Sequence, residues 1–190
     1  MDKKIDLRIL KTQSKLTTAL AEMMQEVNFD QITVFQLCER AHIRRATFYK
    51  HFSDKYDLVT TVVRNNITKM SKRICEVCEP SDPVQYFSLF IREVITYFKD
   101  RPEVLSNLLC SNAFNSIFDI VTKCTGEALE NDLKIASNQG LLAGADISTL
   151  ASFTNGGLAV MVLFWLRNRD TTEEAFMSKI NTILTRLFVR

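Results

Sequence analysis

The helical spacing of apolar residues is the feature that most limits how this chain can fold. From Ile5 to Val27, and again from Phe176 to Phe188, apolar residues recur every three or four positions, which is the period of an amphipathic α-helix. Helix breakers are scarce, because the 190 residues include 5 Gly and 3 Pro, against roughly 13 and 10 at average usage. Sandwiches and barrels need many turns, so the sequence predicts an all-α protein of about nine helices.

Capping signals indicate where some of these helices begin. Thr33 and Gln36 have the spacing of a capping box, in which a hydroxyl and an amide satisfy the free N–H groups of a helix start. This box predicts a short helix over residues 34–41. Thr171 and Glu174 have the same spacing and predict a second capping box before the last helix.

Two short helices in the first third of the chain predict a helix-turn-helix. The first covers residues 34–41 and the second residues 44–51. Phe48 and Phe52 lie four apart, so both point to one side of the second helix and are expected to be core. The predicted organisation is an N-terminal three-helix domain over residues 1–53 and a C-terminal helical domain over residues 54–190.

A local basic cluster lies on the second short helix. Residues 40–50 contain four cations and no acid, whereas the whole chain has a net charge of +2. With the two phenylalanines beneath, the helix turns outward Arg45, Ala46, Tyr49 and Lys50. Arginine can bind guanine bidentately, while tyrosine and lysine bind phosphates. The cluster predicts contact with a DNA major groove, and a solvated charged turn is the alternative interpretation.

The run ITVFQLCERAHIRRATFYKHFSDKYDL resembles the DNA-binding domain of the tetracycline-repressor (TetR/AcrR) family of bacterial transcription regulators. The matching positions are Thr33, Val34, Thr47, Phe48, Tyr49, His51, Phe52, Lys55 and Leu58. The resemblance covers roughly the first 60 residues. It implies a homodimeric regulator that binds a palindromic double-stranded DNA operator, with repression relieved by a small-molecule effector as the default.

The resemblance also assigns roles to single residues. Thr33, Tyr49, His51 and Lys55 would bind phosphates, while the candidates for base edges are Arg44, Arg45 and Lys50. Including Thr47, the expected DNA-binding residues are Thr33, Arg44, Arg45, Thr47, Tyr49, Lys50, His51 and Lys55.

Two positions depart from the family pattern. His42 stands where the turn usually has glycine, and Arg44 stands where a small hydroxyl residue usually caps the recognition helix. Histidine is enriched at positive φ, so the turn is expected to form. The missing cap is expected to cost about 0.5 to 2 kcal/mol of stability unless another group replaces it.

The last two helices are expected to pair two copies of the chain. Their apolar faces surround a glycine pair, and a glycine inside a helix costs about 0.5 to 1 kcal/mol, so close approach of another backbone is a plausible reason for it. The expected dimerisation residues are Phe153, Gly156, Gly157, Val160, Phe164, Phe176, Ile180, Ile183, Leu184 and Leu187. Burial within one copy is the alternative for each of them. The longest apolar run, from Leu158 to Leu166, is about half of a membrane span and is expected to be a buried helix.

The effector pocket is expected among aromatic residues of the C-terminal domain. Residues that could line it are Phe87, Phe90, Arg92, Tyr97, Phe114, Phe118 and Trp165. An aromatic side chain at helical spacing is more often core, which is the alternative here. The signal could also be a partner protein, making the chain an activator-type adaptor, as in family members that resemble regulators of dihydroxyacetone kinase operons. A helical ligand-binding dimer without DNA binding is the third alternative.

Other chemistry finds little support in the sequence. No signal-peptide pattern is visible at the N-terminus, so a cytoplasmic location is expected, without membrane attachment. Cys75 and Cys78 have the spacing of a redox pair or half a zinc site, but no second close Cys/His pair completes a metal site. No serine or carboxylate pair is spaced as a catalytic set, so no enzymatic activity, cofactor or metal is predicted.

Overall fold

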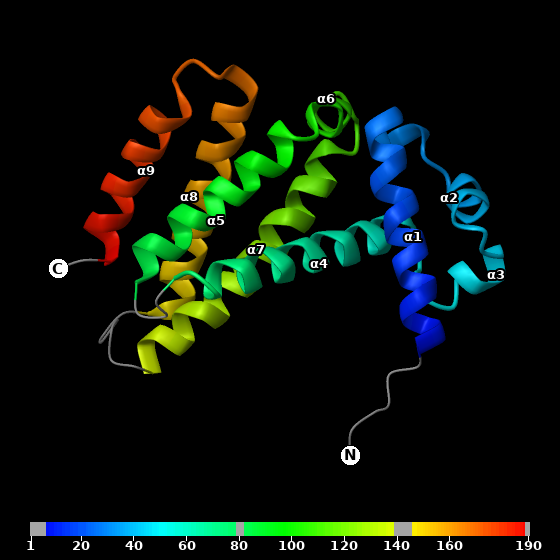
Figure 1. Ribbon diagram of the computed structural model, residues 1–190, viewed down its shortest axis with the longest axis horizontal. Coiled ribbons are helices and arrows are strands. Elements are labelled where there is room, and N and C mark those ends of the chain that lie inside the picture. The colour runs from blue at the N-terminus through cyan, green and yellow to red at the C-terminus, as the bar shows by residue number, and fades with distance from the viewer. Residues whose placement is uncertain (1–6, 79–81, 139–145, 189–190) are drawn as a thin grey trace. The chain divides into compact units, whose positions relative to one another are not determined.

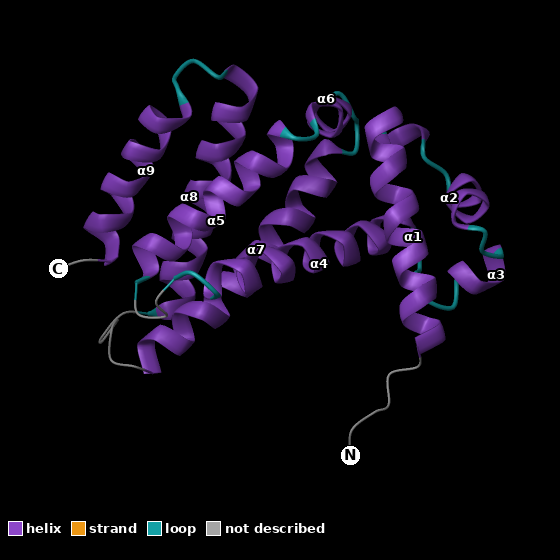
Figure 2. Ribbon diagram, in the orientation of Figure 1, coloured by secondary structure: helices purple, strands orange, loops and turns teal. Residues whose placement is uncertain are grey.

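The computed structural model describes residues 7–78, 82–138 and 146–188 of the chain. The described residues form nine α-helices and one short 3-10 helix, and no strand occurs among them (Figure 1, Figure 2). The predicted all-α fold is confirmed. Backbone contacts divide the chain into two compact units, of which the first, here called the head, contains Met1–Asn65 and Arg101–Val121. The second unit, here called the body, contains Asn66–Asp100 and Thr122–Arg190.

The head is built around the N-terminal helices. Its elements are α1 (Leu7–Glu26), η1 (Phe29–Gln31), α2 (Val34–Ala41), α3 (Arg45–Phe48), the first part of α4 (Lys55–Cys75), α6 (Pro102–Leu109) and the start of α7 (Phe114–Asn138). α6 packs against α1, where the Asn107 side-chain amide donates a hydrogen bond of 3.0 Å to the Met24 carbonyl. The core includes the fully or almost fully buried Leu16, Leu20, Leu37, Phe48, Phe52 and Leu58.

The body consists of the remaining helices. They are α5 (Pro83–Lys99), α8 (Ile147–Asn168), α9 (Glu173–Phe188) and the later parts of α4 and α7. α5 packs against α8 and α9. Trp165 of α8 stacks on Phe176 of α9 with ring centroids 5.1 Å apart, and its indole N–H donates to the Thr171 carbonyl at 3.1 Å. These contacts fix the turn between the last two helices.

The capping box at the start of α2 is confirmed. The Gln36 backbone N–H donates to Thr33 Oγ1 at 3.2 Å, and the Thr33 backbone N–H donates to Gln36 Oε1 at 2.9 Å. Both donors would lack intrahelical partners, so the box fixes the first residue of α2.

The predicted capping box before the last helix is wrong by one residue. α9 begins at Glu173, and its cap is Thr172, whose hydroxyl oxygen accepts from the Ala175 backbone N–H at 3.2 Å. The carbonyl of Thr171 already accepts the Trp165 indole N–H. Thr171 and Thr172 have the same hydroxyl group, so spacing alone does not tell which of them caps the helix. The bond from Trp165 to Thr171 is a tertiary contact that the spacing does not reveal.

α8 is not the buried helix that its apolar run predicts. Buried residues make up 17% of its most apolar stretch, and Phe153 and Phe164 are 69% and 58% exposed. By length and composition alone, α8 is apolar enough to cross a membrane. Phe153, Gly157, Val160 and Phe164 share one side of the helix, because they follow each other at intervals of four, three and four residues. This outward side explains the low burial of α8.

Candidate nucleic-acid interface

The turn between α2 and α3 forms without glycine. His42 ends α2 in the left-handed conformation, with φ of 53° and ψ of 49°. Its backbone N–H donates to the Glu39 carbonyl at 3.1 Å, and the following N–H of Ile43 donates to the Cys38 carbonyl at 2.9 Å. These bonds satisfy carbonyl groups at the end of α2, as in a glycine-terminated helix. The prediction that histidine supports this turn is confirmed.

α3 is a very short helix whose first residue has no side-chain cap. Arg44 occupies the N-cap position, and its side chain accepts no hydrogen bond from the helix start, as predicted. Regular helix covers Arg45–Phe48, and turns continue it to residue 51, where the sequence predicted helix throughout. The Phe52 N–H donates to the Phe48 carbonyl at 2.9 Å, so the backbone stays coiled through the turn.

Two phenylalanines form the floor of α3. Phe48 and Phe52 are buried, and their ring centroids lie 5.6 Å apart. Tyr49 places the edge of its ring against Phe48 at 5.4 Å, yet 53% of the residue is exposed. Arg45, Ala46 and Lys50 are also exposed. The four side chains predicted to face outward do so, and they form what is here called the reading face of α3.

The other expected DNA-binding residues surround the reading face with different degrees of exposure. Arg44 and Thr33 are exposed, while Thr47 and His51 are half-buried. The hydroxyl of Thr33 is occupied by the capping box of α2. A phosphate at this position would share that oxygen with the helix start.

Lys55 is held inside the head. Its Nζ donates to the carbonyls of Phe29 and Ile32, both at 2.9 Å, and lies 4.4 Å from the centre of the Phe29 ring. Burial lowers the pKa of Lys55, although the nearby Asp30 carboxylate acts in the opposite direction. The ammonium group therefore satisfies backbone carbonyls in this structure, whereas the family resemblance assigns it to a phosphate.

Arg40 is likewise engaged by another residue of the head. Its guanidinium donates two hydrogen bonds to the Glu26 carboxylate, at 2.6 and 2.7 Å, and ties α2 to the end of α1. The hydrogen bond from Arg40 lowers the pKa of Glu26, and its charge adds to the effect. Of the four cations in residues 40–50, Arg44, Arg45 and Lys50 are left to give the α3 region its basic character.

The expected dimerisation residues fall into two groups. Buried within the body are Phe176, Ile180 and Leu184, whereas the exposed ones are Phe153, Gly156, Gly157, Val160, Phe164, Ile183 and Leu187. A Cβ atom added at Gly156 or Gly157 would meet no atom within 4 Å. Packing within one chain thus gives no reason for either glycine.

The expected effector-pocket residues are distributed over both units. Phe114 and Phe118 belong to the head and stack with centroids 5.8 Å apart. In the body, Phe87 and Trp165 are buried, Phe90 and Tyr97 are half-buried, and Arg92 is exposed.

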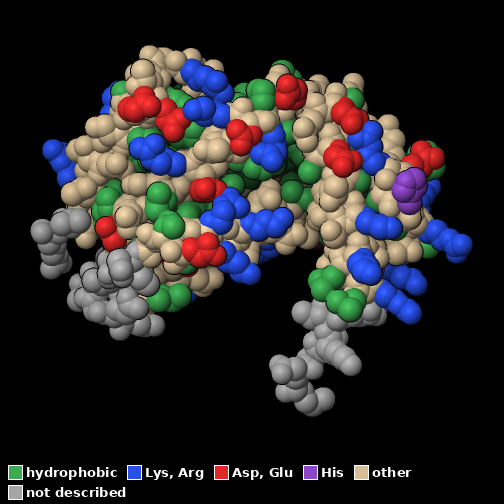
Figure 3. Space-filling view, viewed as in Figure 1, with side chains coloured by type: hydrophobic (Ala, Val, Ile, Leu, Met, Phe, Trp, Pro, Cys, Tyr) green, Lys and Arg blue, Asp and Glu red, His purple; other side chains and the backbone are tan. Residues whose placement is uncertain are grey.

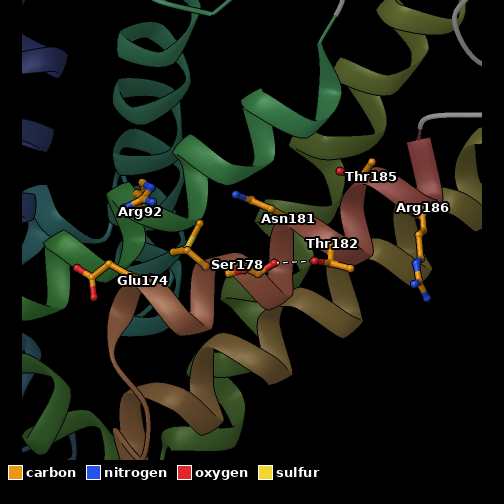
Figure 4. Close-up of a pocket in the computed structure, with 8 residues that line it drawn as sticks. Arg92, Glu174, Ser178, Asn181, Thr182, Thr185 and Arg186 are labelled. Carbon is orange, nitrogen blue, oxygen red and sulfur yellow. Dashed lines mark hydrogen bonds between the residues drawn. The ribbon is translucent and has the colours of Figure 1, made fainter.

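An open groove of about 550 Å³ lies between Arg92 of α5 and one face of α9 (Figure 4). It is lined by Arg92, Glu174, Met177, Ser178, Asn181, Thr182, Thr185 and Arg186. Three hydroxyl groups and two guanidinium groups are part of this lining, so the groove offers hydrogen-bonding groups beside apolar surface to a small molecule. Arg92 is the residue that the groove shares with the predicted effector set.

Sequence reasoning missed a polar junction inside the body. The Tyr86 hydroxyl donates to Asp132 Oδ2 at 2.7 Å and lies 3.0 Å from the Ser71 hydroxyl, which joins α5, α7 and α4. Burial raises the pKa of both Tyr86 and Asp132. No sequence pattern pairs residues 46 positions apart, so no local signal could have found this junction.

The cysteine pair forms no disulfide in the structure. Cys75 is exposed, whereas Cys78 is buried and its thiol lies 3.8 Å from the Asp82 carbonyl oxygen. Within residues 7–78, 82–138 and 146–188, no group of three or more His, Cys, Asp or Glu side chains is placed to hold a metal ion.

Known proteins resemble this chain at its N-terminus and in its fold. Residues 16–62 match the family described as "Bacterial regulatory proteins, tetR family". An uncharacterized HTH-type transcriptional regulator, YxbF of Bacillus subtilis (strain 168), is 27% identical over 82 residues, which are 43% of this chain. The match spans about a fifth of that relative, 22% of its length.

Solved structures share the fold over nearly the whole chain. A putative TetR-family transcriptional regulator from Syntrophomonas wolfei has a TM-score of 0.66 at 14% identity, with 94% of this chain and 95% of that one covered. RolR in complex with its ligand resorcinol has a TM-score of 0.64 at 18% identity, with 96% and 95% covered. Residues 16–62 of this chain are thus similar to the tetR family of bacterial regulatory proteins, and its fold is similar to that of solved proteins described as TetR-family regulators.

Proposed function

We propose that this chain is a homodimeric, cytoplasmic transcription regulator that binds a palindromic DNA operator with α3. The observation that carries the proposal is the reading face, where Arg45, Tyr49 and Lys50 are exposed above the buried Phe48 and Phe52. A basic, aromatic face on a rigid apolar floor suits the major groove, which admits an α-helix. The proposed DNA-binding domain is residues 1–53, and residues 54–190 are the proposed effector and dimerisation domain.

The reading face combines two kinds of DNA contact. Arg45, with Arg44 and Lys50 beside it, has donors that match the O6 and N7 acceptors of guanine. Tyr49, Thr47 and His51 have polar groups suited to phosphate oxygens, which fix the position of the helix along the duplex. Lys55 supports these contacts indirectly, because its hydrogen bonds join the start of α4 to the segment before α2.

The exposed side of α8 supports the homodimer. Phe153 and Phe164 present large apolar surfaces to solvent, and between them Gly156 and Gly157 allow another backbone to approach closely. A second copy that packs on this side and on Ile183 and Leu187 would cover both features. Two-fold pairing would place two α3 helices about 34 Å apart, in successive major grooves.

The proposed signal is a small-molecule effector. The chain is proposed to repress transcription, and binding of the effector is proposed to relieve this repression. RolR, which has a similar fold, binds resorcinol, a small polar aromatic molecule. The groove beside α9 offers Arg92 and three hydroxyl side chains to a ligand of this kind. Binding there would need to favour one of two conformations that differ in DNA affinity.

The test measures DNA affinity by fluorescence anisotropy at one stated salt concentration, with operator duplexes selected from a random library. Arg45→Ala is expected to weaken operator binding by about 5- to 150-fold for each half-site, the equivalent of about 1 to 3 kcal/mol for each bidentate base contact that is lost. Tyr49→Phe keeps the ring packing on Phe48 and removes one phosphate donor. Lys72→Ala removes an exposed cation from the last turn of α4 and should leave affinity unchanged. Failure of the natural chain to bind any duplex would refute the proposed function.

A further inference from the structure

The first half of α1 has an exposed face of a single charge. Lys11 and Lys15 are exposed and lie four residues apart, and Arg8 lies three residues before Lys11. No acidic residue occurs between Leu7 and Ala21. Side chains three and four apart are neighbours on a helix surface, so the three cations form one basic row.

The ion pairs among the described residues do not account for Lys11 and Lys15. Among the described residues, neither Lys11 nor Lys15 forms an ion pair, and like charges at this spacing destabilise a helix. The other end of α1 differs, because Glu26 there binds Arg40 of α2. Two neighbouring lysines that weaken their own helix and form no ion pair with a described residue indicate a functional surface.

The basic row belongs to the same part of the head as α3. Leu16, the residue after Lys15, is fully buried in the core that also contains Phe48 and Phe52. Figure 3 shows Lys and Arg side chains gathered where α1 begins and where α3 lies, at the right of the view. In this view, basic side chains where α1 begins and where α3 lies are visible on the same face of the head.

We propose that Lys11 and Lys15 bind backbone phosphates of the DNA beside the bases that α3 contacts. This inference rests on the proposed function and adds α1 to the interface as a second, sequence-independent element. Lysine acts on phosphate as a flexible point charge, and each phosphate it neutralises releases condensed counterions. The row would thus raise affinity for every duplex and contribute little to the choice between sequences.

Salt titration separates this role from base contact. Affinity is measured from about 50 to about 200 mM salt, on the selected operator and on a duplex of arbitrary sequence. Because the proposed dimer carries each lysine twice, Lys11→Gln and Lys15→Gln should each reduce the slope of log affinity against log salt by about 1.8, and the double variant by about 3.6. The ratio of operator to arbitrary-duplex affinity should not change. Lys72→Gln, an exposed cation of the body, should leave the slope as it is in the natural chain.

The outcomes distinguish this inference from the function beneath it. Removing like-charge repulsion should leave the thermal unfolding temperature unchanged or raised, so a smaller slope cannot come from a weakened fold. If the natural chain binds DNA while both glutamine variants keep its slope, α1 does not bind phosphates and the proposed function stands. An altered affinity ratio would instead assign the lysines to base edges and overturn the inference. If the natural chain binds no duplex, the proposed function itself fails.

Discussion

The Lys55 ammonium nitrogen lies 2.9 Å from the carbonyl oxygen of Phe29 and 4.4 Å from the centre of the same residue's ring. A second carbonyl, that of Ile32, accepts from it at 2.9 Å. One side chain at the start of α4 thereby holds the segment that precedes α2. The position of the helix-turn-helix depends on this contact as well as on its apolar core.

Replacing Lys55 with methionine is expected to destabilise the head. The substitution keeps most of the side-chain volume but leaves the carbonyls of Phe29 and Ile32 without this donor, so unfolding free energy should fall by about 1 to 3 kcal/mol. Urea unfolding followed by far-UV circular dichroism measures the change. Lys72→Met on the exposed last turn of α4 is the matched control and should have little effect. Unchanged stability with a large loss of DNA affinity would instead support a phosphate contact.

Supplying the missing cap of α3 is expected to separate stability from DNA binding. Arg44→Ser offers a hydroxyl to the free N–H groups of the helix start, so stability should rise by about 0.5 to 2 kcal/mol. Operator affinity should fall, because a cation next to the reading face is lost. Calorimetry and anisotropy on the same preparation measure both quantities. A variant that is both more stable and binds as tightly would show that Arg44 does not contact DNA.

Adding a methyl group at Gly157 is expected to have opposite effects on the single chain and on the dimer. Within the chain the new Cβ meets nothing, so Gly157→Ala should stabilise the helix by about 1 kcal/mol through propensity. Across the proposed interface the same atom would hold two backbones apart. The dimer of the variant should therefore dissociate at a higher protein concentration than the dimer of the natural chain. Sedimentation velocity over a concentration series measures this dissociation. An unaltered dimer would place the interface elsewhere.

The half-buried carboxyl of Asp132 is expected to make stability depend on pH. Burial raises its pKa in the folded state above the usual value of an aspartate, so the folded chain holds this proton more tightly than the unfolded chain does. The stabilisation from this bound proton is complete below the pKa that Asp132 has in the unfolded chain. It is lost as pH rises through the pKa that Asp132 has in the folded chain. Asp132→Asn should remove this loss, so the variant should gain stability relative to the natural chain as pH rises from about 4 toward neutrality. Urea unfolding of both proteins across that pH range tests this prediction. The same dependence of unfolding free energy on pH in both proteins would contradict it.

Signals that lie within one turn of helix could be read from the sequence. Thr33 and Gln36 are three residues apart, so their capping box needs no tertiary information. The left-handed conformation of His42 agrees with the glycine that the resembled family usually has at this position, and histidine is enriched at positive φ. The burial of Phe48 and Phe52 follows from their spacing on a helix with charged residues opposite.

Contacts between distant segments could not be read in the same way. Arg40 counts as a free cation until Glu26, 14 residues earlier, is placed beside it. Lys55 binds backbone carbonyls, which every residue possesses and which therefore leave no mark in the sequence. The predicted burial of the apolar run in α8 is wrong for a related reason, since a strongly apolar helix has the same sequence pattern whether its own chain or another covers it.

The side chains that support α3 are separate from those that it presents to solvent. Phe48 and Phe52 hold the short helix in place, while Arg45, Ala46 and Lys50 project away from that floor. Exchanging the outer residues therefore leaves the folding of the head largely unaffected. A lineage carrying this scaffold could be redirected to new promoters by a few codon changes, without first acquiring compensating mutations elsewhere.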